Sequence, residues 1–86
     1  QRRRSDSTGF FDFEIGQDSP AVGRTVREVA WPEGCIVVSI QRGNDVLVAS
    51  GEQVLKMGDA LTAFGDEAAR RRLAERLRVE NREIQP

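Results

Sequence analysis

Carboxylates and a single thiol are the side chains that catalysis could draw on in this sequence, because its 86 residues include no histidine. Without an imidazole, neither a Ser-His-Asp nor a Cys-His arrangement can form, and the usual proton acceptor at neutral pH is missing. One cysteine without histidine also excludes a zinc site of ordinary ligand spacing. The sequence therefore predicts no catalytic residue and no metal ligand, and it indicates a chain that is not an enzyme.

The remaining candidates for chemistry have simpler structural interpretations. Asp12 and Glu14 lie two residues apart, where a strand places both on one face. Such a pair could hold a cation or act as an acid and a base, but a solvated strand face is the interpretation we favour. Cys35 opens the most apolar segment, which indicates a buried structural thiol. Since a lone cysteine forms no intramolecular disulfide, we expect a reducing, cytoplasmic compartment.

Arginines are the residues best suited to bind a ligand. Arg24, Arg27 and Arg42 flank a predicted short helix and a predicted hairpin. A guanidinium group binds phosphate through two parallel hydrogen bonds, so these residues could grip a phosphate if a second subunit completed the pocket. Ordinary surface arginines are the alternative. Neither a G-x-G-x-x-G nor a G-x-x-x-x-G-K-[ST] spacing is present, which excludes nucleotide binding by those two routes.

The charge pattern gives no support to a nucleic-acid partner. Thirteen basic and fourteen acidic residues leave a net charge of -1, so no positive field would draw the chain onto a polyanion. The arginine run 70–72 follows Asp66 and Glu67 at the i,i+4 spacing of helix ion pairs. We therefore expect a solvated helix face there and no nucleic-acid partner.

Four apolar segments predict strands, at residues 10–15, 35–41, 45–49 and 60–64. In the first segment, Phe11, Phe13 and Ile15 share one face. The second segment is apolar on both faces, which is typical of a central strand covered on both sides. Between the second and third segments, Gly43-Asn44 predicts a hairpin, so these two strands are expected to pair antiparallel.

Two helices are predicted around these strands. The first is short, ends before Trp31-Pro32, and has two open starts. It begins either at Ser19-Pro20, as N-cap and first helical residue, or at the capping box of residues 25–28. Its apolar positions at helical spacing are Val22, Val26 and Val29. The second helix is capped by Asp66 and is expected to pack on the sheet through the stripe Ala69, Leu73 and Leu77.

The order strand, helix, three strands, helix predicts an α+β fold with a mostly antiparallel sheet of about four strands and helices packed on it. The length allows one domain. Residues 1–9 lack apolar side chains and begin with Gln1, so we interpret them as a linker stub from a longer protein, with a processed terminus as the alternative. The domain is predicted at 10–79 and a tail at 80–86. No apolar run reaches the length of a membrane span, so we expect a soluble chain.

The ordered motifs resemble those of the RCK C-terminal domain, also called the TrkA C-terminal domain. The resemblance covers about residues 10 to 78. It depends on segments 19–25, 26–29 and 32–34, on the strand 36–43 that follows, and on the closing residues Gly51, Val54, Leu55, Gly58, Asp59 and Leu61. The version of residues 31–35, Trp-Pro-Glu-Gly-Cys, looks most like copies appended to bacterial ClC-type chloride channels.

The resemblance implies a cytoplasmic regulatory module that forms a homodimer. Such modules are attached to potassium channels, potassium uptake systems, cation/proton antiporters and other transporters. It also implies a membrane transport domain in the same polypeptide, which would tether this domain to the inner face of the membrane. No cofactor is expected.

Members of the family that bind ligands, including cyclic dinucleotides, hold them across the dimer axis. A nucleotide or cyclic dinucleotide is therefore the ligand that the resemblance implies here. The family pocket corresponds to residues 22–28 and 34–35 and to Ala49, which stands where a proline is expected. Together with the arginines, the predicted ligand-binding residues are Val22, Arg24, Arg27, Gly34, Cys35, Arg42 and Ala49. Two alternatives stay open: a structural dimerisation module without a small-molecule ligand, and a small nucleic-acid-binding domain.

Overall fold

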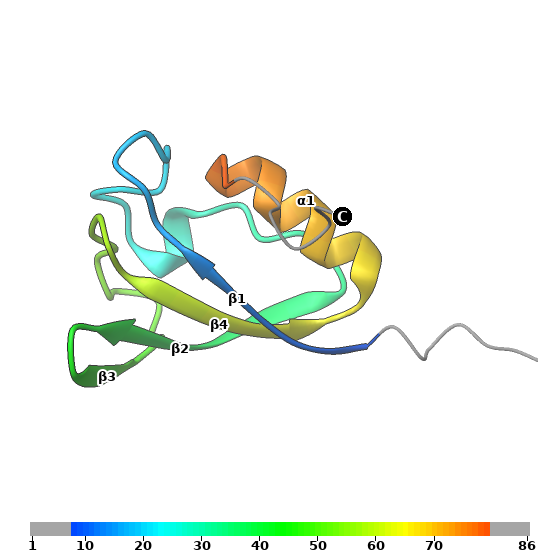
Figure 1. The fold of residues 1–86 in the computed structure, drawn as a ribbon, viewed down its shortest axis with the longest axis horizontal. Helices are drawn as coiled ribbons and strands as arrows, with labels where there is room; N and C mark the ends of the chain where they lie inside the picture. Colours follow the sequence, from blue (N-terminus) through cyan, green and yellow to red (C-terminus); the bar gives the residue numbers. More distant parts are fainter. Residues whose placement is uncertain (1–7, 80–86) are drawn as a thin grey trace, which may run out of the picture.

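The computed structural model describes residues 8–79 as a sheet with one helix packed across it (Figure 1). Residues 1–7 of the predicted linker and the predicted tail at 80–86 lie outside the described residues, whereas Gly9 already belongs to the first strand. The elements in chain order are β1 (Gly9–Glu14), the 3₁₀ helix η2 (Val26–Glu28), β2 (Cys35–Arg42), β3 (Asp45–Val48), β4 (Ala60–Gly65) and α1 (Glu67–Leu77).

The four strands form one antiparallel sheet in the order β1-β4-β2-β3. The last strand, β4, lies between β1 and β2, so the first and last strands pair, with β1 at one edge of the sheet and β3 at the other. β2 and β3 form the expected hairpin around Gly43-Asn44, with Arg42 opposite Asp45. Gly43 has a φ of 61°, which suits the first central position of a type II′ turn. The predicted α+β class with an antiparallel sheet of about four strands is confirmed, whereas the order of the strands within the sheet was not predicted.

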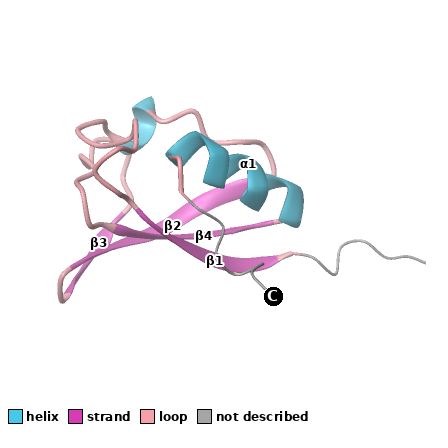
Figure 2. Cartoon of the chain, turned by 45° about the horizontal axis from the view of Figure 1, so that its top comes forward, coloured by secondary structure: helices cyan, strands magenta, loops and turns pink. Residues whose placement is uncertain are grey.

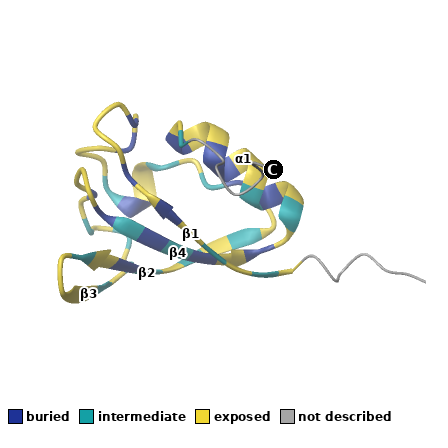
Figure 3. Cartoon of the chain, viewed as in Figure 1, coloured by how far each residue is buried: buried dark blue, intermediate teal, exposed yellow. Residues whose placement is uncertain are grey.

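One face of the sheet is covered, and the core lies beneath that cover. Figure 2 shows α1 and η2 on the same side of the strands. Side chains on the inner faces of β1, β2 and β4 form one core cluster with the apolar stripe of α1, and the spacing of that stripe matches the prediction from the sequence. Figure 3 marks the buried residues along these elements. The fully buried apolar side chains are Ile15, Ile40, Leu55, Leu61, Ala63, Ala69, Leu73 and Leu77.

The first predicted helix is reduced to the single turn η2. Of its two predicted starts, the capping box is confirmed, because the Thr25 side chain accepts from Glu28 N while Glu28 Oε1 accepts from Thr25 N at 2.9 Å. The start at Ser19-Pro20 is wrong. Residues 20–23 form turns, and the Gly23 N–H donates to Leu55 O at 2.8 Å, which leads the chain away from a helical path.

The expectation that β2 is covered on both sides is also wrong. Ile36 and Val38 are 64% and 44% exposed, while Ile40 on the other face is fully buried. An antiparallel sheet can leave one face to solvent, whereas the covered apolar strands of parallel sheets have helices on both sides. The apolar character of the outer face of β2 therefore needs another explanation than the core of this domain.

The second helix, α1, begins where the sequence predicts. Asp66 is its N-cap, and its carboxylate accepts from Ala69 N at 2.8 Å. The helix spans 11 residues and packs through Ala69, Leu73, Ala74 and Leu77. Among residues 8–79, no helix is long and apolar enough to cross a membrane.

Removing this cap should weaken the fold measurably. We expect Asp66→Ala to lower the free energy of unfolding by about 1 kcal/mol, because the Ala69 N–H loses its acceptor. Asp66→Asn keeps an acceptor oxygen and should cost much less. Urea denaturation at one protein concentration measures both changes. Equal losses in the two variants would contradict a capping role, and Glu75→Ala, on the exposed side of α1, serves as the control.

Candidate functional site

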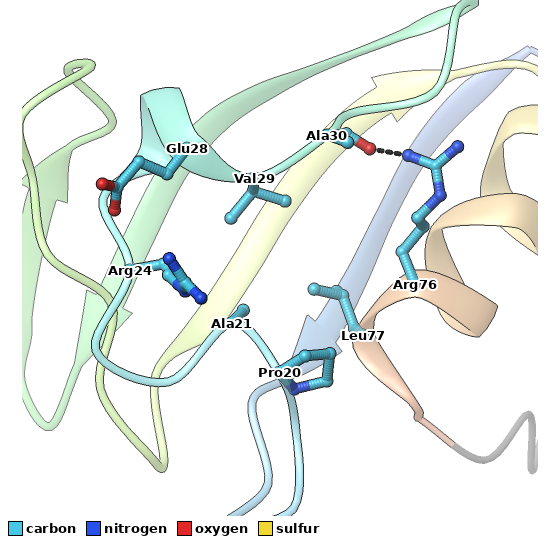
Figure 4. A pocket seen from close by; sticks show the side chains of 8 residues that line it. All are labelled: Pro20, Ala21, Arg24, Glu28, Val29, Ala30, Arg76 and Leu77. Carbon is cyan, nitrogen blue, oxygen red and sulfur yellow. Dashed lines mark hydrogen bonds between the residues drawn. The ribbon is translucent and has the colours of Figure 1, made fainter.

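A pocket of about 360 Å³ lies between the C-terminal turn of α1 and the segment that carries η2 (Figure 4). Arg24 and Glu28 lie along one side of it, and Arg76 and Leu77 reach it from α1 on the other. Its lining is completed by Pro20, Ala21, Val29 and Ala30. The pocket therefore combines two guanidinium groups and one carboxylate with an apolar lining.

Each charged group at the pocket has a defined setting. A hydrogen bond from the Thr25 N–H holds the pKa of Glu28 below its ordinary value, and the charge of Arg24 contributes in the same direction. Glu28 is therefore ionised, and its carboxylate is held by the backbone N–H of Thr25, the N-cap residue of η2. Arg76 Nη1 donates to the Ala30 backbone oxygen, which aligns the guanidinium group with the pocket wall (Figure 4). The surplus charge at the pocket is positive, which suits an anionic ligand.

Arg27 belongs to η2 but is not among the residues that line the pocket; it lies against the segment that follows β3. Its backbone N–H donates to Gly51 O at 2.9 Å. A β-carbon placed on Gly51 would lie 3.2 Å from Arg27 Nη2, so the glycine leaves room for the arginine side chain. Ala49, just before this segment, is half-buried and packs against the core, and Val22 is 39% exposed. Arg24 therefore lines the pocket beside η2, and Arg27 belongs to η2 itself, against the segment that follows Ala49.

Arg42 has a different role. Its Nε and Nη2 donate to the two carboxylate oxygens of Asp59, both at 2.8 Å, and Nη2 also donates to Val54 O at 2.9 Å. Asp59 Oδ2 accepts in addition from Lys56 N at 2.8 Å, and Asp59 is fully buried. These hydrogen bonds tie β2 to the loop before β4. Arg42 is thus engaged with the protein itself and is not brought to the pocket.

Gly34 and Cys35 also lie away from the pocket, at the N-terminal end of α1. They line a shallow depression of about 340 Å³ with Ile36, Phe64 and Asp66. The Cys35 thiol lies 3.6 Å from Pro32 O, and burial raises its pKa, with the Asp66 carboxylate adding to the rise. A thiol with a raised pKa stays protonated near neutral pH, which fits a structural role and not that of a nucleophile.

Arg76 is a charged pocket residue that sequence reasoning missed, together with the apolar lining residues Pro20, Ala21, Val29, Ala30 and Leu77. It was one of several arginines on α1 outside the apolar stripe. A usable signal existed, because Arg76 directly precedes the buried Leu77 in the last turn, and a residue beside a buried stripe lies at the rim of the packed face. Among residues 8–79, no three His, Cys, Asp or Glu side chains gather where they could hold a metal ion.

Comparisons with known proteins identify related sequences. The family model of the TrkA-C domain matches residues 10–78. The Trk system potassium uptake protein TrkA of Halomonas elongata is 34% identical over 61 residues, 71% of this chain. The TrkA homolog 2 of Methanosarcina mazei is 29% identical over 58 residues, 67% of this chain. The chain spans only 13% of the length of each of these two relatives.

Solved structures share the fold. An RCK_C domain dimer of S. agalactiae BusR in complex with c-di-AMP superposes with a TM-score of 0.72 at 20% identity, covering 81% of this chain and 96% of that chain. A structure described as an RCK domain with cda gives a TM-score of 0.72 at 23% identity, covering 81% and 99%. At such identities the likeness establishes the fold alone.

A further structural neighbour is a complex of a protein with DNA. BusR in complex with its busAB promoter DNA superposes with a TM-score of 0.70 at 18% identity and covers 91% of this chain but 38% of that chain. The name of that complex runs against the expectation of no nucleic-acid partner. Since only the fold is shared and most of that longer chain is unmatched, the expectation stays a prediction for this chain.

Proposed function

The chain belongs to the TrkA-C domain family, and from this premise we propose that it is a cytoplasmic regulatory domain that works as a pair within an ion transport protein. The observation that carries the proposal is the family match over residues 10–78. The fold agrees with it, because the structure superposes on the RCK_C domain dimer of BusR with a TM-score of 0.72. The domain acts by binding and not by catalysis.

Potassium is the ion that we propose for the parent protein. Both curated relatives described above are potassium uptake proteins. The chloride channels suggested by residues 31–35 have no counterpart among those relatives. We also propose that a transport domain belongs to the same polypeptide or associates with it. The domain described here would then lie at the inner face of a membrane.

The proposed ligand is an anion with phosphate groups, in the class of nucleotides and cyclic dinucleotides. Arg24 and Arg76 supply guanidinium groups on two sides of the pocket, whereas the Arg27 side chain lies against Gly51. Val29 and Leu77 add an apolar lining against which a base or a sugar can pack. The c-di-AMP of the BusR RCK_C dimer belongs to the same ligand class. Ala49 departs from the proline of the family pattern, so the contacts differ in detail.

The mechanism we propose is a shift between two arrangements of the pair. A ligand that contacts α1 and the η2 segment favours the arrangement in which these two elements are held together. The free energy available for regulation equals the difference in ligand affinity between the arrangements, typically about 1–3 kcal/mol. The linker to the transport domain would then carry this bias to the membrane.

Binding of the ligand class is measurable by thermal unfolding. A ligand at about 100 times its dissociation constant should add about 2.7 kcal/mol to the free energy of unfolding. We expect this for at least one of c-di-AMP, ATP, ADP or NAD, and we expect Arg24→Ala to weaken the affinity about tenfold or more through loss of a charge-assisted hydrogen bond.

The matched control is Arg72→Ala, which removes an exposed arginine of α1 outside the pocket and should leave the affinity unchanged. Equal losses in the two variants would point to general electrostatic attraction instead of a site. If none of the four ligands raises the unfolding temperature, the second candidate function holds, a structural dimerisation module without a small-molecule ligand. The absence of the family proline at Ala49 is the observation that favours it.

A further inference from the structure

The connection between η2 and β2 is tied to both ends of α1 (Figure 1). In the last turn of the helix, Arg76 Nη1 donates to Ala30 O. At the other end, the backbone N–H of Asp66, the N-cap residue of α1, donates to Gly34 O at 3.2 Å. The connection therefore runs along the helix in the opposite direction, and we call its residues 29–34 the strap.

The strap also forms part of the pocket wall. Val29 and Ala30 line the pocket, and Arg76 and Leu77 line it from α1 (Figure 4). A ligand held between α1 and the η2 segment therefore meets the strap at the end that Arg76 holds. The end at Gly34 does not line this pocket, so occupancy acts on one end of the strap alone.

Trp31, the residue after Ala30, joins the strap to η2. Its indole Nε1 donates to Val26 O at 2.8 Å, and its backbone N–H donates to Val29 O at 3.0 Å. Val26 O also accepts from Val29 N at 3.2 Å, so one carbonyl group closes the η2 turn and holds the indole. The indole ring is half-buried and packs against the core. Movement of the strap at Ala30 thus acts directly on the indole hydrogen bond.

The contact between Arg76 and the strap is one that an anion can displace. Both Arg76 and Ala30 are exposed, so water can satisfy each of them after they separate, and no buried polar group is left without a partner. No carboxylate of residues 8–79 forms an ion pair with Arg76. A phosphate group offers the guanidinium two charge-assisted hydrogen bonds, whereas the Ala30 carbonyl is a neutral acceptor. Phosphate is therefore the stronger partner.

We propose that Arg76 is a latch that the ligand operates. Without ligand, Arg76 holds the strap through Ala30 O; with ligand, a phosphate group takes the guanidinium and frees that end of the strap. The ligand then joins α1 to Arg24 in place of the strap. The inference rests on the proposed function, because it names how occupancy of the proposed pocket is sensed. Since the strap leads into β2, its release carries the signal from the pocket to the sheet.

The indole N–H of Trp31 reports the state of the strap, because the chain has one tryptophan and gives one indole N–H signal in a nitrogen-15 NMR spectrum. We expect Arg76→Ala to speed the exchange of this proton with water about fivefold without ligand, since the strap loses a hydrogen bond from a charged donor. Arg76→Lys keeps a charged donor and should stay close to the unmodified protein. The matched control is Arg72→Ala, an exposed arginine of α1 outside the pocket, which should change nothing.

Saturating c-di-AMP, ATP, ADP or NAD, whichever raises the unfolding temperature, should speed indole exchange in the unmodified protein and add nothing further in Arg76→Ala. Stabilisation of the fold alone would slow exchange, so the two effects have opposite signs.

A ligand that raises the unfolding temperature without speeding indole exchange would overturn the latch and leave the proposed pocket intact. So would an Arg76→Ala protein, folded by circular dichroism, whose indole exchanges as slowly as that of Arg72→Ala. If none of the four compounds changes either measurement, the proposed ligand and the latch both fail.

Discussion

Asp59→Ala should lower the free energy of unfolding by about 3 kcal/mol, a loss at the lower end of those seen when one partner of a buried ion pair is removed. The fully buried Asp59 carboxylate accepts hydrogen bonds from Arg42 and from Lys56 N. Without it, Arg42 loses its two hydrogen bonds to Asp59 in the loop before β4 and keeps the one to Val54 O. Arg42 retains access to water, which keeps the loss from being larger. Urea denaturation at fixed protein concentration measures the change.

The same contact makes stability depend on pH. The hydrogen bonds from Arg42, with Lys56 N contributing, hold the pKa of Asp59 below its ordinary value despite burial. A carboxyl whose pKa is lower in the folded state stabilises the fold above the unfolded-state value of about 3.9. This contribution is lost as pH falls from there through the folded pKa. The difference between unmodified protein and Asp59→Ala should therefore be constant near neutral pH and shrink below about pH 4.

An exposed aspartate provides the control for this prediction. Asp18→Ala changes the same residue type in the turn after β1, and its effect should lie within about 0.5 kcal/mol. A loss of similar size in both variants would contradict the special role of Asp59. So would a difference that persists unchanged at the lowest pH where the protein is folded.

Gly65→Ala should be at least as damaging, with an expected loss of about 3 kcal/mol or more. A β-carbon at this position would lie 2.3 Å from Gly34 O and 2.4 Å from Cys35 Cβ. These atoms belong to the residue before β2 and to the first residue of β2, which pairs with β4 there, so no flexible side chain can move aside. The two strands must separate where they lead into α1.

Gly9→Ala is the matched control, because Gly9 lies opposite Gly65 on the other neighbouring strand. A β-carbon on Gly9 would meet nothing within 4 Å. We expect a small effect there, and thermal unfolding compares the two variants directly. If Gly65→Ala were as stable as Gly9→Ala, the close approach of β2 to β4 at this point would be wrong.

Local sequence rules predicted most of the fold. The apolar alternation around Phe13, the two-residue turn at Gly43 and the Asp66 cap each depend on neighbours within four residues, and the structure confirms all three. The sequence alone did not decide which of the two predicted starts the first helix uses. It is decided by a distant partner, because Leu55 O accepts from the Gly23 N–H and ends any helix before Thr25.

Tertiary contacts explain what the sequence could not provide. Arg42 was predicted to bind a ligand from its place beside the hairpin. Its actual partner, Asp59, is 17 residues away along the chain and contacts Arg42 only in the folded structure. Arg76 reaches the pocket because the end of α1 lies against residues 20–30, a packing that no local pattern encodes. The sequence could not show that the outer face of β2 is exposed, because a strand covered on one face and a strand covered on both can have the same composition.

Our central proposal is that this TrkA-C domain works as a pair. Sedimentation equilibrium of the unmodified chain between about 1 and 100 µM tests that claim most directly, since it reports mass without any ligand. We predict a mass that rises with concentration toward twice the 9.6 kDa of one chain. A mass that stays at 9.6 kDa over the whole range would contradict the account.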